Sequence, residues 1–282
     1  MKKILYLFFV LLLAFEVRAQ QNVVFKIKYL PNHTYAGSIN LGMVFKVDLS
    51  GDTAVLAKMK SKGLSSPLAM NMDMKMSGTT KTGESGTNQA FPIKMDFKFD
   101  NVSADLNGKN IPVPSAKLGQ GVSIYGHVGS DGKIIADSIG GAKKADTSQE
   151  KVTKLMNMIQ KQIQFPDHPM KIGETFTQEM PMSVPVGGSN MDLSSQVVYK
   201  LVSISDGNAY FDVQQTMNMS VPIAGATINI NGSGTGKLIY SIKDNFATDY
   251  NTNVNLKVTG QIKTLKIDAT AQMTMGYKYT VN

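Results

Sequence analysis

A strict alternation of apolar and polar residues over long stretches is the feature that most constrains this sequence. From Leu265 to Val281 every odd-numbered residue is apolar or aromatic, and every even-numbered residue is polar or glycine. The pattern recurs in residues 246–258, 91–99 and 39–49. Because successive side chains of a strand point to opposite faces, the pattern predicts antiparallel strands with one buried and one wet face.

Short turn motifs separate these stretches and predict hairpins between roughly a dozen strands. Several strands exceed the usual length of about five or six residues, and long strands in one twisted sheet must curl. We therefore expect a mainly β fold, a large curved antiparallel sheet (a half-barrel or partly closed barrel) with one amphipathic helix packed on it. The turn motifs are Ser50-Gly51-Asp52, Asn107-Gly108-Lys109, Asp131-Gly132, Asp206-Gly207 and Asp244-Asn245.

Residues 147–164 depart from the strand pattern and place apolar side chains at helical spacing. Thr147 followed by Glu150 forms a capping box. Pro166 ends the helix, because the residue before a proline is pushed out of the α region. We expect the apolar stripe of this helix to cover the concave face of the sheet. The stripe consists of Val152, Leu155, Met156, Ile159 and Ile163.

The first residues are typical of an export signal. Lys2 and Lys3 precede the apolar run Ile4–Phe15, and Val17–Ala19 forms a small-residue cleavage site. We expect residues 1–19 to be removed and the mature protein to be soluble and exported, either periplasmic or extracellular. No later run reaches the roughly eighteen apolar residues of a transmembrane helix. The remainder, 20–282, is expected to be one β-rich domain with strands in 22–139, the helix 147–164 and strands in 174–281.

Charge and composition argue against several functions. Without the predicted signal, which holds three Lys or Arg residues and one Glu, the net charge falls from +8 to +6. Arg18 is the only arginine, so the mature chain lacks the side chain that reads phosphate and guanine bidentately, and we expect no nucleic-acid partner. Cysteine is absent, and the three histidines have no metal-ligand spacing, so we expect no metal and no cofactor.

No catalytic motif is present, so we nominate no catalytic residue and do not expect an enzyme. The glycine-rich segment Gly232–Gly236 is followed by strand pattern and not by a helix start. We therefore interpret it as a bulge or a bend where the sheet curls or the helix approaches closely, and not as a phosphate-binding loop.

Methionines repeat at strand spacing and supply the candidate binding residues. Core filling, an adaptable apolar pocket and thioether binding of Cu(I) are three interpretations of this pattern. The apolar-pocket hypothesis also takes in Phe97 and part of the helix stripe. Its candidate residues are Met70, Met72, Met74, Met76, Phe97, Leu155, Met156, Ile159, Ile163, Met217, Met219, Met273 and Met275.

The export signal, the opening Tyr29–Tyr35, the central helix and the restart Pro169–Phe176 resemble an uncharacterised family of exported, β-rich proteins of the Bacteroidota, known only as a domain of unknown function. The resemblance implies no catalytic residues. In architecture, a curled sheet with a helix on its inner face is also similar to the LolA/LppX type of periplasmic lipid carrier, which implies an apolar ligand.

These observations leave several functions open. The first is an exported protein that binds a lipid or another apolar molecule on the face lined by methionine and aromatic residues. The second is a structural or envelope-interaction protein with a filled core. A hydrolase with scattered Asp, Ser and His residues is a further alternative, and so is an outer-membrane barrel, whose strands also alternate. The alternation also predicts that Phe97 and Met273 are buried while Lys98 and Thr274 are exposed.

Cleavage of the signal gives a first testable prediction. We expect the protein from its source to begin at Gln20 and to occur in the soluble envelope or extracellular fraction. N-terminal sequencing of fractionated cells measures both. Retention of Met1, or recovery in the cytoplasm, would contradict the prediction.

Overall fold

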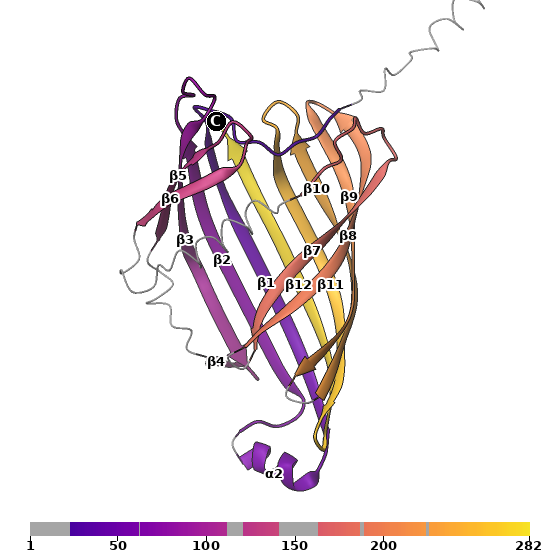
Figure 1. Ribbon diagram of the computed structural model, residues 1–282. Helices are drawn as coiled ribbons and strands as arrows, with labels where there is room; N and C mark the ends of the chain where they lie inside the picture. The colour runs from indigo at the N-terminus through magenta and orange to yellow at the C-terminus, as the bar shows by residue number, and fades with distance from the viewer. Residues whose placement is uncertain (1–22, 62, 112–120, 141–162, 187–188, 224–225) are drawn as a thin grey trace, which may run out of the picture.

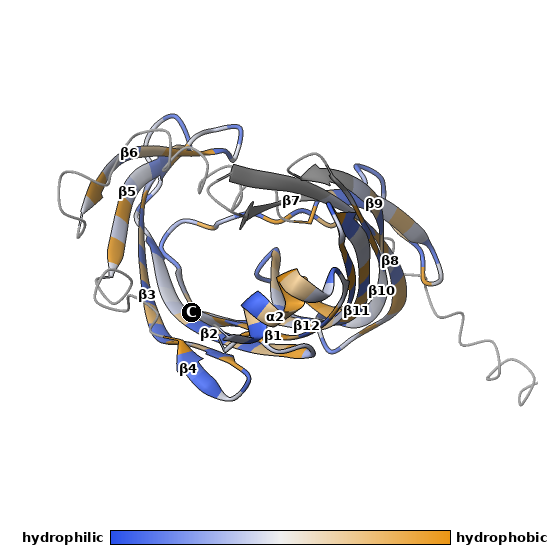
Figure 2. Cartoon of the chain, turned by 90° about the horizontal axis from the view of Figure 1, so that it is seen from below, coloured by the Kyte–Doolittle hydropathy of each residue, from blue (hydrophilic) through white to orange (hydrophobic). Residues whose placement is uncertain are grey.

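The computed structural model describes residues 23–61, 63–111, 121–140, 163–186, 189–223 and 226–282. Within these ranges twelve antiparallel strands form one sheet, and the predicted mainly β fold is confirmed. The strand order is β6-β5-β3-β2-β1-β12-β11-β10-β9-β8-β7, with β4 paired to β3. Figure 2, which looks along the strands, shows that the sheet curls into an incomplete ring whose edges are β6 and β7.

Most strands are longer than ten residues, so the ring is tall (Figure 1). In the first half of the chain the strands are β1 (Thr34–Gly51), β2 (Leu68–Thr82), β3 (Phe91–Leu106), β4 (Lys109–Ile111), β5 (Val122–Val128) and β6 (Ile134–Gly140). In the second half they are β7 (Thr175–Val186), β8 (Ser189–Ser205), β9 (Asn208–Ile223), β10 (Ala226–Ser241), β11 (Phe246–Ile262) and β12 (Leu265–Val281).

The apolar face of the sheet is the concave one. Tyr199 of β8 and Tyr250 of β11 belong to one buried cluster although β9 and β10 stand between them. Side chains three strands apart can meet only on the side toward which the sheet curls. Because side chains alternate along each strand, this orientation extends down the strands. We call this side the inner face and the opposite, polar side the outer face.

An extended segment, residues 23–33, crosses the end of the ring at which the C-terminus lies (Figure 1). We call it the N-terminal strap. The Phe25 side chain is fully buried, with its ring centroid 5.3 Å from that of Phe211 and 5.1 Å from that of Tyr240. The Tyr240 hydroxyl donates to Lys26 O at 2.8 Å, and the Tyr35 hydroxyl accepts from Leu30 N at 2.7 Å. The strap therefore closes this end with an aromatic core.

Glycines allow the tight curl at β10. Gly232, Gly234 and Gly236 all belong to the inner face, and β10 pairs with both neighbours through them without a register shift. A Cβ at Gly234 or Gly236 would collide with the backbone of β11, at Asn253 O and Asn251 O respectively. The prediction that strand structure continues through this segment is confirmed, and the pairing shows no bulge in it. Only glycine permits such close backbone approach.

Four of the five predicted turns are hairpins. In two of them, Asn107-Gly108 and Asp206-Gly207, both residues have positive φ, as a two-residue hairpin turn requires. The prediction was wrong at Ser50–Asp52, where helix α2 (Thr53–Ser61) follows β1 at the other end of the ring (Figure 1). Asp52 Oδ1 accepts from Ala54 N at 2.8 Å, so this residue caps a helix instead of turning a hairpin.

The predicted central helix lies mostly outside the described residues, which exclude 141–162. The last two residues of the predicted range, Ile163 and Gln164, are described and are not helical. The Gln164 N–H donates to Gln178 Oε1 of β7 at 3.0 Å, so it bonds a neighbouring strand and not a helical carbonyl.

The predicted alternation assigns the tested residues to the correct face of the sheet, but it overestimates how deeply two of them are buried. Lys98 and Thr274 are exposed, as expected. Phe97 and Met273 belong to the inner face but are half-buried and not buried. The strap covers only one end of the ring, and burial varies farther along the strands. Met217, Ile228 and Ile230 form a buried cluster on β9 and β10, whereas the methionines of β1, β2 and β12 are half-buried.

The strap offers a direct test of this packing. Phe25→Ala should lower the free energy of unfolding by about 3 to 5 kcal/mol, because it removes a ring that fills the aromatic core. Val24→Ala, next to it but with a side chain 42% exposed, should change that free energy by no more than about 0.5 kcal/mol. Denaturant melts of both variants measure the difference, and equal losses would contradict the described strap.

Candidate functional site

The candidate site is the inner face away from the strap. Strand pairing arranges its side chains in rows that run across the sheet from β9 to β2. Two neighbouring rows cross the middle of the sheet. One is Gln215, Gly234, Val254, Met273, Met43 and Met72, and the other is Val213, Gly236, Thr252, Met275, Leu41 and Met74.

Methionines from three strands meet in these rows. Met43 of β1 stands opposite Met72 on one side and Met273 on the other. Directly opposed residues of antiparallel strands have Cβ atoms about 4.5–5.5 Å apart, so the three side chains are neighbours. All are half-buried. We call the following set the methionine wall: Met43, Met70, Met72, Met74, Met76, Met273 and Met275.

The other predicted site residues are spread around the ring. Met217 and Met219 lie on the inner face of β9, separated from β12 by β10 and β11. Phe97 lies on β3 beyond β2, and its ring approaches Gly78. Leu155, Met156 and Ile159 lie outside the described residues. Ile163 is buried in the cluster that contains Phe25 and Phe211.

Several inner-face residues of this site were not predicted from the sequence. Met43, Leu41 and Phe45 were assigned to a strand but not to the site, although they share the alternation that identified it. Nothing local indicates that β1 pairs with β12, the pairing that brings Met43 beside Met273. The buried polar residues Gln215 and Thr252 were not predicted as site residues either. They occupy positions that alternation assigns to the apolar face, and nothing else in the sequence distinguishes them.

The inner face carries no charge. Among the side chains that the structure describes on the eleven strands other than β4, every Asp, Glu, Lys and His belongs to the outer face or to a turn. The buried polar side chains of the inner face are neutral, and they include Ser195, Gln215 and Thr252. An uncharged wall can accept an apolar molecule without desolvating an ion.

Buried tyrosines line the end of the site that adjoins the strap. Burial raises the pKa of Tyr199, and the nearby Tyr250 hydroxyl raises it further. Burial also raises the pKa of Tyr250, whose ring stacks on that of Tyr277 at a centroid distance of 5.4 Å. Their hydroxyls are therefore neutral at physiological pH, and each can donate and accept a hydrogen bond.

The outer face has its own hollow, of about 720 Å³, across β1, β12, β11, β10 and β9. Amide and hydroxyl side chains line it, among them Asn40, Asn251 and Thr274. Lys237 Nζ lies 2.5 Å from Asp212 Oδ1 at its β10–β9 side. This hollow lies on the face opposite the methionine wall.

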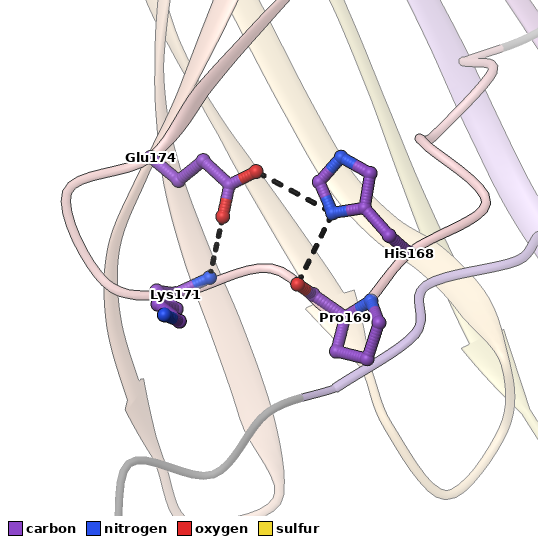
Figure 3. A network of polar contacts seen from close by, with 4 residues as sticks. All are labelled: His168, Pro169, Lys171 and Glu174. Atoms are coloured by element: carbon purple, nitrogen blue, oxygen red, sulfur yellow. Dashed lines mark hydrogen bonds and ion pairs between the residues drawn. The ribbon is translucent and has the colours of Figure 1, made fainter.

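The three histidines lie apart from one another. His33 Nδ1 is 2.7 Å from Pro31 O in the strap, and His127 pairs with Asp137 on the outer face of β5 and β6. His168 Nδ1 lies 3.5 Å from Glu174 Oε1, and Glu174 also accepts from Lys171 N at 2.9 Å (Figure 3). This contact fixes the turn before β7. Among the described residues no group of three His, Cys, Asp or Glu side chains could hold a metal ion.

In the ranges that the structure describes, we find no helix with the length and hydropathy needed to cross a bilayer.

Comparison with known proteins adds two distant structural similarities. No protein-family model and no curated protein matches the sequence. The β domain of the Bordetella autotransporter BrkA aligns at 8% identity over 87% of this chain and 99% of its own, with a TM-score of 0.36. The translocator domain of the autotransporter NalP from Neisseria meningitidis aligns at 9% identity over 86% and 88%, with a TM-score of 0.17. At these scores neither similarity supports a functional argument, and the resemblance to an uncharacterised exported family stays a prediction.

The buried tyrosines predict a pH dependence. The pKa values of Tyr35, Tyr199, Tyr240 and Tyr250 are raised by burial, so the folded state keeps these protons when the unfolded chain releases them. Their stabilising contribution is present below the ordinary tyrosine pKa of about 10 and is lost as the pH rises above it.

Denaturant melts at about pH 8 and about pH 11, with tyrosinate absorbance recorded in parallel, check this expectation. We expect a lower unfolding free energy at the higher pH. Full ionisation of all tyrosines near pH 10 in the folded protein would contradict the burial of these four.

Proposed function

We propose that this protein is an exported binding protein that holds a lipid or another apolar molecule on the methionine wall. One observation carries the proposal: a concave, uncharged and methionine-rich face that is only half-buried in the described structure. Methionine is unbranched and polarizable, so a wall built from it can adapt to flexible chains.

A contrast between two parts of the inner face supports this proposal. Near the strap, inner-face residues such as Phe211, Tyr240 and Leu238 are at most 1% exposed. The methionines farther along β1, β2 and β12 keep accessible surface. A fold whose inner face served only as core would gain by burying this wall as completely as the aromatic end.

The outer face favours a protein surrounded by water over an outer-membrane barrel. Lipid-facing strands present apolar side chains on the outside. Here Lys46, Lys75 and Lys257 occupy exposed outer-face positions, and charged residues recur along several strands. Burying such charges in lipid costs about 2 to 4 kcal/mol each at the midplane.

The structural protein with a filled core is the main alternative, and a test must separate it from a binding protein. A hydrolase is the weaker alternative, because the described histidines do not converge. Thioether binding of Cu(I) stays an alternative use of the methionine wall, since soft sulfur ligands favour that ion.

The proposed binding function predicts that the protein carries an apolar ligand and that this ligand contacts the inner face. Protein purified from its source should carry an apolar molecule, which native mass spectrometry and lipid extraction would identify. Delipidated protein should bind an apolar fluorescent probe saturably. Met74→Gln, which places an amide on the inner face, should weaken that binding about tenfold, equivalent to about 1.4 kcal/mol.

The matched control is Lys75→Gln, which introduces the same side chain at the next position but on the exposed outer face. It should leave binding unchanged. Absence of both a copurified molecule and saturable probe binding would leave the filled-core alternative.

A further inference from the structure

A polar patch away from β2 interrupts the apolar inner face. It consists of Ser195 and Tyr199 on β8, Gln215 on β9, and Tyr250 and Thr252 on β11. Each is at most 6% exposed. A polar group inside an apolar wall costs free energy unless it is hydrogen-bonded, so a group of five requires a physical reason.

Part of the reason is that these groups satisfy one another. Gln215 Nε2 donates to Ser195 Oγ at 2.9 Å. The Tyr199 hydroxyl donates to Met180 Sδ at 3.9 Å, and Tyr199 belongs to the same buried cluster as Tyr250. Hydroxyls can both donate and accept, so these groups keep hydrogen-bonding capacity beyond the contacts between them.

Gln215 Oε1 has no hydrogen-bond donor among the described residues. Every fully enclosed side-chain polar atom in the described part of the chain has a partner, so this oxygen is not fully enclosed. Gly234, directly opposite on β10, and Gly236 beside it have no side chains to cover the patch.

The patch adjoins the methionine wall. Along one row, Gln215 is followed by Gly234, Val254 and then Met273. Thr252 stands directly opposite Met275 in the next row. With strands about 4.8 Å apart, Gln215 and Met273 are separated by about 14 Å across the sheet. One elongated molecule can therefore touch both the polar patch and the methionines.

The absence of charged side chains on the described inner face restricts the chemistry of such a molecule. The described inner face offers no Lys or His to an ionised carboxylate or phosphate, and no Asp or Glu to an amine. A buried ion without a partner costs several kcal/mol, whereas a neutral donor or acceptor can use the patch.

We propose that the ligand of this protein is an amphiphile with an uncharged hydrogen-bonding head, such as an alcohol, an ester or an amide. Its head bonds the polar patch at Gln215, Tyr250 and Thr252, and its chain lies along the methionine wall. This inference rests on the proposed binding function and specifies the chemistry of its ligand.

The test compares three probes of equal chain length on the delipidated mature protein: hexadecanol, hexadecane and ionised palmitate. Each competes with an apolar fluorescent dye at neutral pH. Hexadecanol should bind about tenfold more tightly than hexadecane, because its hydroxyl bonds the patch, and more tightly than palmitate, whose charge has no partner.

Two variants remove the polar groups while conserving volume, Gln215→Leu and Tyr250→Phe. Either should bring the affinity for hexadecanol to within about threefold of that for hexadecane and leave the hexadecane affinity unchanged. Binding of hexadecane also reports that a variant is folded. Gln214→Leu, on the exposed outer face of the same strand, is the matched control and should keep the full preference.

The outcomes separate the inference from the function on which it rests. Equal affinity of the wild-type protein for hexadecanol and hexadecane, or tightest binding of palmitate, would overturn the inference while the binding function stands. A preference for hexadecanol that persists in both variants would also overturn it. If neither the dye nor any probe binds, the proposed function itself is wrong.

Discussion

The backbone ladder between β1 and β12 is the interaction on which the rest of the structure depends. It joins the first and last strands, from Tyr35 opposite Val281 to Gly51 opposite Leu265. Each half of the chain is a series of hairpins, and this ladder makes them one surface with one inner face. Without it, two narrower sheets would expose additional edges and divide the methionine wall between them.

The single sheet must bury its apolar face against itself, because no second sheet packs on it in the described structure. Right-handed twist supplies part of the curvature. Gly234 and Gly236 supply more at β10, where a side chain would strike β11. At one end the strap completes the burial with Phe25, and strand tyrosines satisfy its backbone groups. Farther along the strands the same face remains partly accessible, so one continuous surface serves as core at one end and as a candidate site beyond it.

The absence of charge on the described inner face connects this architecture to function. Alternation places Lys and Asp on the outer face and leaves neutral side chains inside. The inner face therefore suits apolar chains, and its buried polar groups lie in two places: from Ser195 to Thr252 on β8, β9 and β11, and at Thr80 and Thr82 on β2 beside the strap. That distribution of polarity is what allows the chemistry of a ligand to be proposed from a structure that contains none.

The sequence by itself determined the fold class, the faces of the strands and most of the turns. The reason is local: side chains alternate along any strand, and turns such as Asp206-Gly207 need particular backbone angles. Only the tertiary structure decided which strands are neighbours, because pairing between β1 and β12 joins residues with no local signal. It therefore decided that Met43 lies between Met72 and Met273, that Tyr199 approaches Tyr250, and that Asp52 caps a helix. Nor could alternation alone show that Phe97 and Met273 are half-buried, because exposure depends on what covers a face, and the strap covers only one end.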